Sequence, residues 1–241
     1  MAISLVMSVY NTEKYVAQAI QSVIDQTFKN WNLVIYDNAS TDNSLKVINR
    51  FKDPRITVIK NSSNVGHVAV LAKAFSNCNS AYIGWVDSDD WLHPTCLELC
   101  YKANSQFVYT CYAEVNQSGK VLVVKNLEPY HKNANLQRFV THHFRLISTE
   151  LFNKIGGIDP NYKHAEDYDL SLRLEELTKP VKVGFEPLYF YRQHSNSLGA
   201  NNRGPQNQDA AKAISAAIKR RELVDQIYLY PGPPFQIRFK L

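Results

Sequence analysis

Apolar runs and stretches of helical periodicity alternate over the first ninety residues of the chain. Residues 3–9 form an almost continuous apolar run, typical of a strand buried on both faces. Residues 16–28 carry apolar side chains at three- and four-residue intervals, which predicts an amphipathic helix with Asn11 or Thr12 as its N-cap. The same signals predict strands at 31–36, 55–59 and 81–86 and helices at 45–51 and 68–75. This alternation predicts right-handed βαβ units on a parallel sheet.

Beyond residue 90 the elements become shorter and more varied. The expected order is a helix at 94–103, a hairpin of 106–115 and 120–125, a polar irregular stretch at 126–143, a strand and a helix within 146–155, a turn at 156–160, a helix at 165–177, short strands within 181–191, a loop at 196–208 and a last helix at 209–228. The proline-rich stretch 230–234 cannot continue that helix.

Three polar clusters, Ser8–Glu13, Asp37–Asp42 and Asp87–Asp90, follow the first, second and fourth of the predicted strands. In parallel sheets ligands bind beyond the carboxyl ends of the strands, so these clusters mark the expected site. The third cluster holds three carboxylates within four residues. Such a group suits Mg²⁺ or Mn²⁺, and the alternative is a solvated acidic turn that also caps the next helix.

Asp87-Ser-Asp-Asp90 after a buried strand resembles the Asp-x-Asp motif of glycosyltransferases with the GT-A fold. Other segments resemble, in order, motifs of the large family 2 of inverting glycosyltransferases: Ser8–Glu13, Asp37–Asp42, Asn64–Gly66, Gly156–Asp159 followed by Glu166–Leu170, and Tyr191–Ser197. The resemblance covers about residues 3–200. It implies an α/β fold of the GT-A type, with a Rossmann-like, mostly parallel central sheet flanked by helices and a smaller antiparallel sheet on the acceptor side.

A single GT-A domain over residues 1–241 follows from this resemblance. Residues 1–105 would be the nucleotide-sugar-binding half, 106–200 the acceptor-binding half, and 201–241 a C-terminal helix and tail. The implied nucleotide-sugar site comprises Ser8, Tyr10, Asn11, Glu13, Asp37, Asn64, Gly66, His67, Asp87, Ser88 and Arg192. Asp37 would accept an N–H of the nucleotide base, or alternatively act as an N-cap or turn residue. A lone exposed histidine is the alternative for His67.

The resemblance also implies metal and catalytic residues. Asp89 and His194 would bind Mn²⁺ or Mg²⁺ at the donor diphosphate, with packing or capping as the alternative for His194. Asp167 would be the general base that takes the proton of the acceptor hydroxyl, with Glu166 beside it orienting a substrate hydroxyl. The alternative for this acidic run is a charged first helical turn. His142 and His143 line an acceptor pocket or form a surface pair.

Composition narrows the class of protein. The chain has 27 basic and 22 acidic residues, a net charge of +5, and no block of five Lys or Arg, which argues against a nucleic-acid-binding protein. The four cysteines have no CxxC spacing, so buried free thiols in a reducing cytosol are expected. No signal-peptide pattern and no apolar run of about 20 residues is present, which predicts a cytoplasmic protein, with peripheral association at the inner membrane face as an option.

Departures from the family pattern bear on the details. Asn38 and Ala39 replace an acid and a glycine, Lys73 stands roughly where an arginine is usual, and the Gln-x-x-Arg-Trp motif of processive synthases is absent. We therefore expect a single transfer from a nucleotide-diphosphate sugar, with a UDP-sugar favoured, to a glycan or lipid-linked acceptor. The alternatives are a catalytically degenerate nucleotide-sugar-binding module and a sugar-phosphate nucleotidyltransferase, whose Gly-rich loop is missing from Ser8–Glu13. Donor sugar, acceptor linkage and oligomeric state stay open.

Overall fold

A seven-stranded sheet with the order β10-β6-β9-β4-β1-β2-β3 forms the centre of the computed structural model, which describes residues 1–195, 197, 203–230 and 236–239. Its strands are β1 (Ile3–Val9), β2 (Trp31–Asp37), β3 (Ile56–Lys60), β4 (Tyr82–Trp85), β6 (Phe107–Thr110), β9 (Arg145–Ser148) and β10 (Val181–Val183). Only β9 is antiparallel to its neighbours in this sheet, so the predicted mostly parallel sheet is confirmed.

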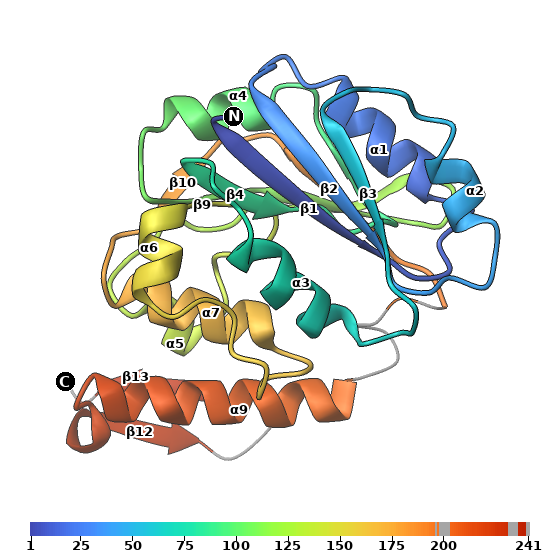
Figure 1. Cartoon of the computed structure of the whole chain (residues 1–241). Coiled ribbons are helices and arrows are strands. Elements are labelled where there is room, and N and C mark those ends of the chain that lie inside the picture. Colours follow the sequence, from blue (N-terminus) through green and yellow to red (C-terminus); the bar gives the residue numbers. More distant parts are fainter. Residues whose placement is uncertain (196, 198–202, 231–235, 240–241) are drawn as a thin grey trace.

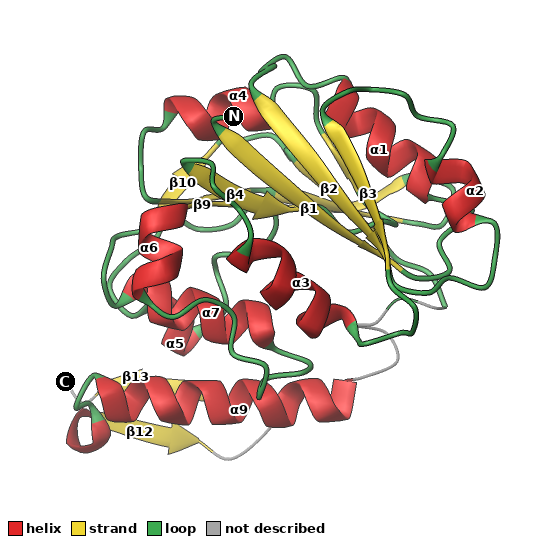
Figure 2. Ribbon diagram, in the orientation of Figure 1, coloured by secondary structure: helices red, strands yellow, loops and turns green. Residues whose placement is uncertain are grey.

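Helices cover both faces of this sheet (Figure 1; Figure 2). One face carries α1 (Val16–Ile24), α2 (Ser44–Ile48) and α4 (Cys96–Lys102), and the other carries α3 (His67–Ser76), α6 (Thr149–Lys154) and α7 (Glu166–Glu175). Leu5 and Met7 of β1 belong to the core on the α1 side, whereas Val6 belongs to the core on the α3 side. Because successive side chains of a strand point to opposite faces, β1 contributes apolar side chains to both cores.

The N-cap expected for the first helix is wrong. α1 begins at Val16 after Tyr15, whose side chain makes no capping hydrogen bond. Asn11 cannot serve as the cap because its side chain is used elsewhere: its Oδ1 accepts the backbone N–H of Thr41 at 2.8 Å. The conformation of the loop after β1 is therefore determined by contacts with the loop after β2 rather than by capping of α1.

A second sheet has the order β5-β11-β7-β8. Its strands are β5 (Trp91–Leu92), β11 (Tyr189–Arg192), β7 (Tyr112–Val115) and β8 (Val121–Lys125). The hairpin of β7 and β8 is confirmed, but the strand expected at 106–115 is divided at Cys111, with β6 in the main sheet and β7 in this one. β11 runs parallel to β7 and antiparallel to β5, so this small sheet links the acidic turn after β4 to the hairpin.

The C-terminal part differs from the sequence expectation. α9 (Arg203–Arg220) begins inside the expected loop at 196–208, of which 196 and 198–202 lie outside the described residues. It ends before residue 228 because Glu222 adopts a left-handed φ of +54°. The 3₁₀ helix Val224–Gln226 follows, and β12 (Ile227–Tyr230) then pairs with β13 (Gln236–Phe239). α9 packs its apolar side chains on α7 and on α5 (Ala134–Gln137).

The expected free thiols are confirmed. All four cysteines are free thiols; Cys78 is half-buried and the other three are buried. In the described part of the chain no helix combines the length and the apolar character needed to cross a membrane.

Candidate active site

Side chains tie together the loops that follow β1 and β2. Asn11 has a left-handed φ of +55° and joins the second loop through Thr41, as described above. Glu13 Oε2 accepts the backbone N–H and the side-chain amide of Asn43, at 2.9 and 2.8 Å. Asn11 and Glu13 thereby fix the spacing of two loops at the carboxyl edge of the sheet, where the donor site is predicted.

Asp37, the last residue of β2, is completely buried. Its Oδ1 accepts the backbone N–H of Ser40 at 3.3 Å, as a turn residue would, whereas its Oδ2 is buried without a hydrogen-bond partner among the described residues. Ser8 of β1 pairs in the sheet with Tyr36, the residue before Asp37. Tyr10, also predicted for the donor site, is 46% exposed. A buried oxygen without a donor is costly. Oδ1 therefore forms the turn, whereas the contact of Oδ2 with an N–H of the base stays a prediction.

Asn64 and Gly66 form a tight turn before α3. Asn64 Oδ1 accepts the backbone N–H of Gly66 at 2.9 Å and the side-chain amide of Asn38 at 2.8 Å. Asn38 Oδ1 in turn accepts the backbone N–H of Val65 at 3.1 Å. Gly66 has a φ of +86°, and a Cβ there would meet nothing within 4 Å, so the glycine is needed for its backbone conformation and leaves open space. Asn38, a departure from the family pattern, thus organises this turn.

The third cluster divides into buried and accessible carboxylates. Asp90 Oδ2 accepts the hydroxyl of Tyr189 at 2.8 Å, and its Oδ1 accepts the backbone N–H of Arg192 at 2.7 Å. Ser88 is buried and accepts the hydroxyl of Thr12 at 3.1 Å. Burial raises the pKa of Asp90 well above its usual range. Asp90 therefore holds the acidic turn against β11.

Asp87 and Asp89 are both only half-buried. Burial, reinforced by the charges of Asp89 and Asp167, raises the pKa of Asp87 to about 7. Asp167 belongs to α7, far along the chain from the acidic turn. The two acidic motifs that the sequence predicted separately therefore lie within electrostatic reach of each other.

Asp89 Oδ2 and His194 Nε2 are 2.9 Å apart, and the His194 ring packs on Tyr15 with centroids 4.9 Å apart. No three His, Cys, Asp or Glu side chains gather into a metal site within the described residues. Two protein ligands with room for phosphate and water are what Mg²⁺ usually takes. In this structure the two atoms form a hydrogen bond, which a bound ion would replace. Adjacent ligands of an octahedral ion with bonds of about 2.1 Å are also about 3 Å apart, so the separation is compatible with Mn²⁺ or Mg²⁺.

Arg192 is almost completely buried, and its guanidinium is used within the protein. It donates to the backbone oxygen of Asp89 at 2.8 Å, to that of Gln117 at 2.7 Å and to Gln18 Oε1 at 2.6 Å. These bonds join the acidic turn, the β7–β8 turn and α1. The predicted contact of Arg192 with the donor stays a prediction, and it would require exchange of one of these bonds.

Asp167 lies in the first turn of α7 and faces a buried arginine that the sequence reading did not single out. Arg145 Nη2 donates to Asp167 Oδ2 at 2.8 Å and Nε donates to the backbone oxygen of Thr141 at 2.6 Å. The guanidinium lies 5.2 Å from the rings of both Trp85 and Phe139. The sequence signal that could have identified Arg145 is an arginine in the otherwise largely apolar strand β9, because a buried charge requires a partner of opposite charge.

The ion pair determines the protonation of Asp167. Burial raises the pKa of this carboxyl, but the charge of Arg145, the influence of His143 and His142 and the hydrogen bond from Arg145 together outweigh burial, and the pKa is lowered. Arg145 Nη1 is buried without a hydrogen-bond partner among the described residues. Asp167 is therefore ionised at neutral pH, as a general base must be.

Glu166, the neighbour of Asp167, is in the opposite state. Burial, followed by the charges of Asp167 and Asp87, raises the pKa of Glu166 to about 8. Its Oε1 lies 3.7 Å from Nε2 of His67, whose own pKa is lowered by burial. Glu166 thus carries a proton at neutral pH and can donate a hydrogen bond. His67 lies beside Glu166 rather than at an isolated surface position.

A pocket of about 300 Å³ opens beside Asp167. Its lining is mostly aromatic and comprises Tyr112, Phe139, His142, His143, Ala165, Asp167, Tyr168, Tyr191, Gln206, Asn207 and Ala210. Burial lowers the pKa of His142 to about 4 and that of His143 to about 3, so both rings are neutral at pH 7. The tandem histidines therefore line a pocket, as one of the two sequence readings had it.

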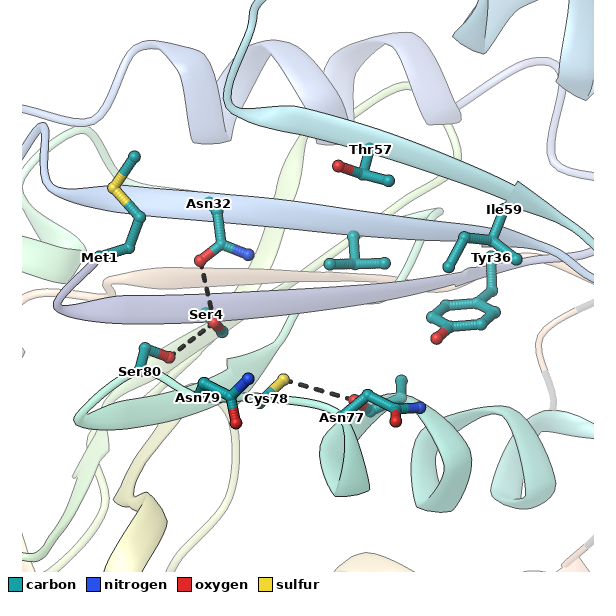
Figure 3. Close-up of a pocket in the computed structure, with 12 residues that line it drawn as sticks. Met1, Ser4, Asn32, Tyr36, Thr57, Ile59, Asn77, Cys78, Asn79 and Ser80 are labelled. Carbon is teal, nitrogen blue, oxygen red and sulfur yellow. Dashed lines mark hydrogen bonds between the residues drawn. The ribbon is translucent and has the colours of Figure 1, made fainter.

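Another pocket, of about 390 Å³, lies away from this cluster (Figure 3). It lies against the sheet beside the C-terminal end of α3, and its polar side chains are uncharged, among them Ser4, Asn32 and Asn77. Its lining contains no aspartate, glutamate, lysine or arginine and none of the predicted site residues. Of the predicted donor-site, metal-binding and catalytic residues, only Asp167 lines one of these two pockets, the one of about 300 Å³.

Comparison with known sequences shows the family. Residues 4–156 match the family described as Glycosyl transferase family 2. The chain belongs to this family. It is 26% identical over 234 residues to the chondroitin synthase of Pasteurella multocida (strain Pm70), covering 94% of the chain and 24% of that relative. It is also 26% identical over 231 residues to Escherichia coli WfaP, a UDP-Glc:alpha-D-GlcNAc-diphosphoundecaprenol beta-1,3-glucosyltransferase, covering 95% and 92%.

Solved structures share the fold. S. aureus TarS 1-349 in complex with UDP-GlcNAc matches with a TM-score of 0.75 at 16% identity, over 90% of this chain and 66% of that one. The mannosyltransferase PcManGT from Pyrobaculum calidifontis, in complex with GDP-Man and Mn²⁺, matches with a TM-score of 0.66 at 13% identity, over 90% and 64%. The expected GT-A-like α/β fold is thus confirmed. The chain spans only about a quarter of the length of the chondroitin synthase that it matches.

Proposed function

We propose that this family 2 protein transfers a sugar from a nucleotide-diphosphate sugar, with a UDP-sugar favoured, to a hydroxyl of a glycan or lipid-linked acceptor, with inversion at the anomeric carbon. The observation that carries the proposal is the environment of the Asp167 carboxylate. This carboxylate is held ionised by Arg145, borders an aromatic pocket on one side and interacts electrostatically with Asp87 on the other. A base between an acceptor pocket and a donor site is what a single displacement requires.

The donor would bind at the carboxyl edge of β1, β2 and β4. Asp37 Oδ2, buried without a partner among the described residues, would accept an N–H of the base. Gly66 leaves space next to the loops after β1 and β2, which supports backbone contact with the nucleotide. Relatives point the same way, since WfaP is named for a UDP-Glc donor and TarS was solved with UDP-GlcNAc.

Asp89 and His194 would hold Mn²⁺ or Mg²⁺. The two side chains lie next to each other, joined by a 2.9 Å hydrogen bond that the ion would replace. The ion supplies Lewis-acid stabilisation of the charge on the departing nucleoside diphosphate. Asp90 and Arg192 keep the acidic turn in place, because they bind each other and the surrounding backbone.

At the acceptor, the hydroxyl would approach the anomeric carbon while Asp167 removes its proton. The new bond joins the acceptor oxygen to the anomeric carbon, the bond from that carbon to the phosphate oxygen breaks, and the nucleoside diphosphate leaves with the bonding electrons. Glu166, protonated at neutral pH, would donate a hydrogen bond that orients a substrate hydroxyl. The aromatic rings of the pocket suit the apolar face of a sugar ring.

The test compares wild type with Asp167→Asn, using UDP-sugar donors and glycan acceptors in the presence of Mn²⁺. A general base contributes about 10²- to 10⁴-fold, so kcat is expected to fall by that factor while UDP binding, measured by calorimetry, is retained. Asp225→Asn, at an exposed site in the C-terminal region, is the matched control and should keep full turnover. Undiminished turnover by Asp167→Asn would sink the assignment, and UDP-sugar binding without any turnover by wild type would favour the degenerate binding module.

We place the reaction in the cytoplasm, at the inner face of the membrane when the acceptor is lipid-linked. The name of WfaP, whose acceptor is a diphosphoundecaprenol-linked sugar, supports a lipid-linked acceptor, because the match covers nearly the whole of both chains. Product analysis by NMR of the new glycosidic bond tests inversion: a retained anomeric configuration contradicts a single displacement.

A further inference from the structure

Strand β8 exposes an apolar surface that the cores do not cover. Four successive side chains, Val121, Leu122, Val123 and Val124, are 46%, 56%, 39% and 47% exposed. Successive side chains of a strand point to opposite faces, so both faces of β8 meet solvent. β8 is also the last strand in the order β5-β11-β7-β8. Long exposed apolar edge strands are unusual in folded proteins and mark interaction surfaces.

Lysines and one aromatic ring surround this strand. Lys120 precedes the four apolar residues and Lys125 follows them. Lys182 Nζ donates to Asn126 Oδ1 at 2.7 Å, directly after β8, and lies 5.8 Å from the ring of Phe185, which is 86% exposed. We name this surface the β8 patch: Val121–Val124 and Phe185, with Lys120, Lys125 and Lys182 at its margin. It combines exposed apolar side chains with basic ones.

The charges of the β8 patch discriminate between occupants. Antiparallel pairing with β8 of a second copy, centred between Leu122 and Val123, would put each Lys120 opposite a Lys125. Like charges directly opposite each other destabilise such a pair. An anionic bilayer instead receives apolar side chains at its interface and attracts lysines to its phosphates. Lys125 lies 3.3 Å from Glu114 and is partly neutralised, so Lys120 and Lys182 contribute most of the attraction.

The β8 patch adjoins the pocket beside Asp167. β8 pairs with β7, and Tyr112 of β7, which lines that pocket, lies opposite Lys125 in the register. Neighbouring strands are about 4.8 Å apart, so the patch begins one strand away from the pocket. A membrane in contact with β8 would therefore lie next to the place where the proposed acceptor sugar binds.

We infer that the β8 patch docks the protein on an anionic phospholipid bilayer and thereby presents the pocket to acceptors attached to membrane lipids. The docking itself stands on the patch alone, whereas its purpose rests on the proposed function. Apolar side chains insert into the interface, and the lysines at the margin bind lipid phosphates.

Flotation with vesicles of phosphatidylglycerol and phosphatidylethanolamine tests the docking, with phosphatidylcholine vesicles as the neutral comparison. We expect the wild-type protein to float with the anionic vesicles, and binding to weaken at about 1 M salt because the Debye length falls to about 3 Å. Leu122→Ser/Val124→Ser should reduce the partition coefficient at least about tenfold, since two aliphatic side chains no longer enter the interface. Val58→Ser/Val224→Ser removes exposed valines elsewhere, on β3 and in the C-terminal region, and should bind as wild type does.

A further variant protects the test against misfolding. Phe185→Ser alters a single side chain that is 86% exposed, and it should also weaken vesicle binding. Equal binding by wild type and Leu122→Ser/Val124→Ser, or no binding by wild type, overturns the inference. So does a wild-type dimer in sedimentation that this double variant dissociates, because the surface would then join two copies. Turnover with a water-soluble acceptor reports on the proposed function separately, and all of these variants should retain it.

Discussion

Replacing Arg145 by methionine removes the cation that balances Asp167. Arg145 is 1% exposed at its side chain, whereas the Asp167 side chain is 23% exposed. Removing one partner of a buried ion pair costs about 3–5 kcal/mol. Asp167 retains some hydration in the variant, so we expect the lower end, about 3 kcal/mol of unfolding free energy at neutral pH. Methionine keeps much of the apolar stem between Trp85 and Phe139, which limits the contribution of lost packing.

The pH dependence of this loss identifies its cause. In the wild-type protein the pKa of Asp167 is lowered, so the ion pair stabilises the fold above the unfolded pKa of about 3.9 and the stabilisation is lost as pH falls through the folded pKa. In Arg145→Met the largest influence opposing burial is gone, so we expect the pKa of Asp167 to be higher than in the wild-type protein. The difference in unfolding free energy between the two proteins is therefore largest at neutral pH and shrinks toward about pH 4.

Urea unfolding followed by tryptophan fluorescence at several pH values measures this difference. Lys102→Met is the matched control, because it removes the cation of an exposed pair with Glu98 and should change stability very little. Arg145→Met/Asp167→Asn should be more stable than Arg145→Met alone, since no unpaired carboxylate remains. A loss as small as that of Lys102→Met, or one that is independent of pH, would refute the assignment of a buried, charge-balancing pair.

Three further changes test other parts of the site and its frame. Asp37→Asn replaces an acceptor oxygen by a donor, and UDP should bind about ten- to hundredfold more weakly in calorimetry; an unchanged Kd contradicts the role of Asp37. Glu166→Gln removes a carboxyl whose pKa is about 8 in the folded protein and about 4.3 in the unfolded chain, and this difference lowers wild-type stability as pH rises between these values. The variant should therefore melt at a higher temperature than wild type at pH 8 and at the same temperature near pH 4. Equal melting temperatures at both pH values would be evidence against a buried neutral acid. Gly84→Ala would bring a Cβ to 2.7 Å from Phe144 Cζ and should lower the free energy of unfolding in urea by about 1–3 kcal/mol. In the control Gly204→Ala, in α9, the added Cβ meets nothing within 4 Å and should not destabilise the protein. Equal effects of the two substitutions would show that the sheet can relax around β4.

Much of the fold of residues 1–105 was predictable because its signals are local. The apolar run of β1 required helices on both faces, and the polar residues after β1, β2 and β4 had to meet at one edge since parallel strands end there. The strand expected at 106–115 was divided between two sheets, because Cys111 marks a change of partner that no local pattern encodes. The last helix ended early because Glu222 adopts a left-handed backbone conformation, which the helical spacing of the apolar residues did not indicate.

For the site, the sequence by itself determined which chemical groups are present and at which edge of the sheet most of them lie. Only the tertiary structure decided their charge states, because burial and charges from distant segments set them. Asp167 is ionised because Arg145 of β9 pairs with it, while its neighbour Glu166 keeps a proton, although both stand in the same helical turn. Likewise the sequence contained the apolar residues of β8, but their exposure follows from the position of that strand at the edge of the second sheet.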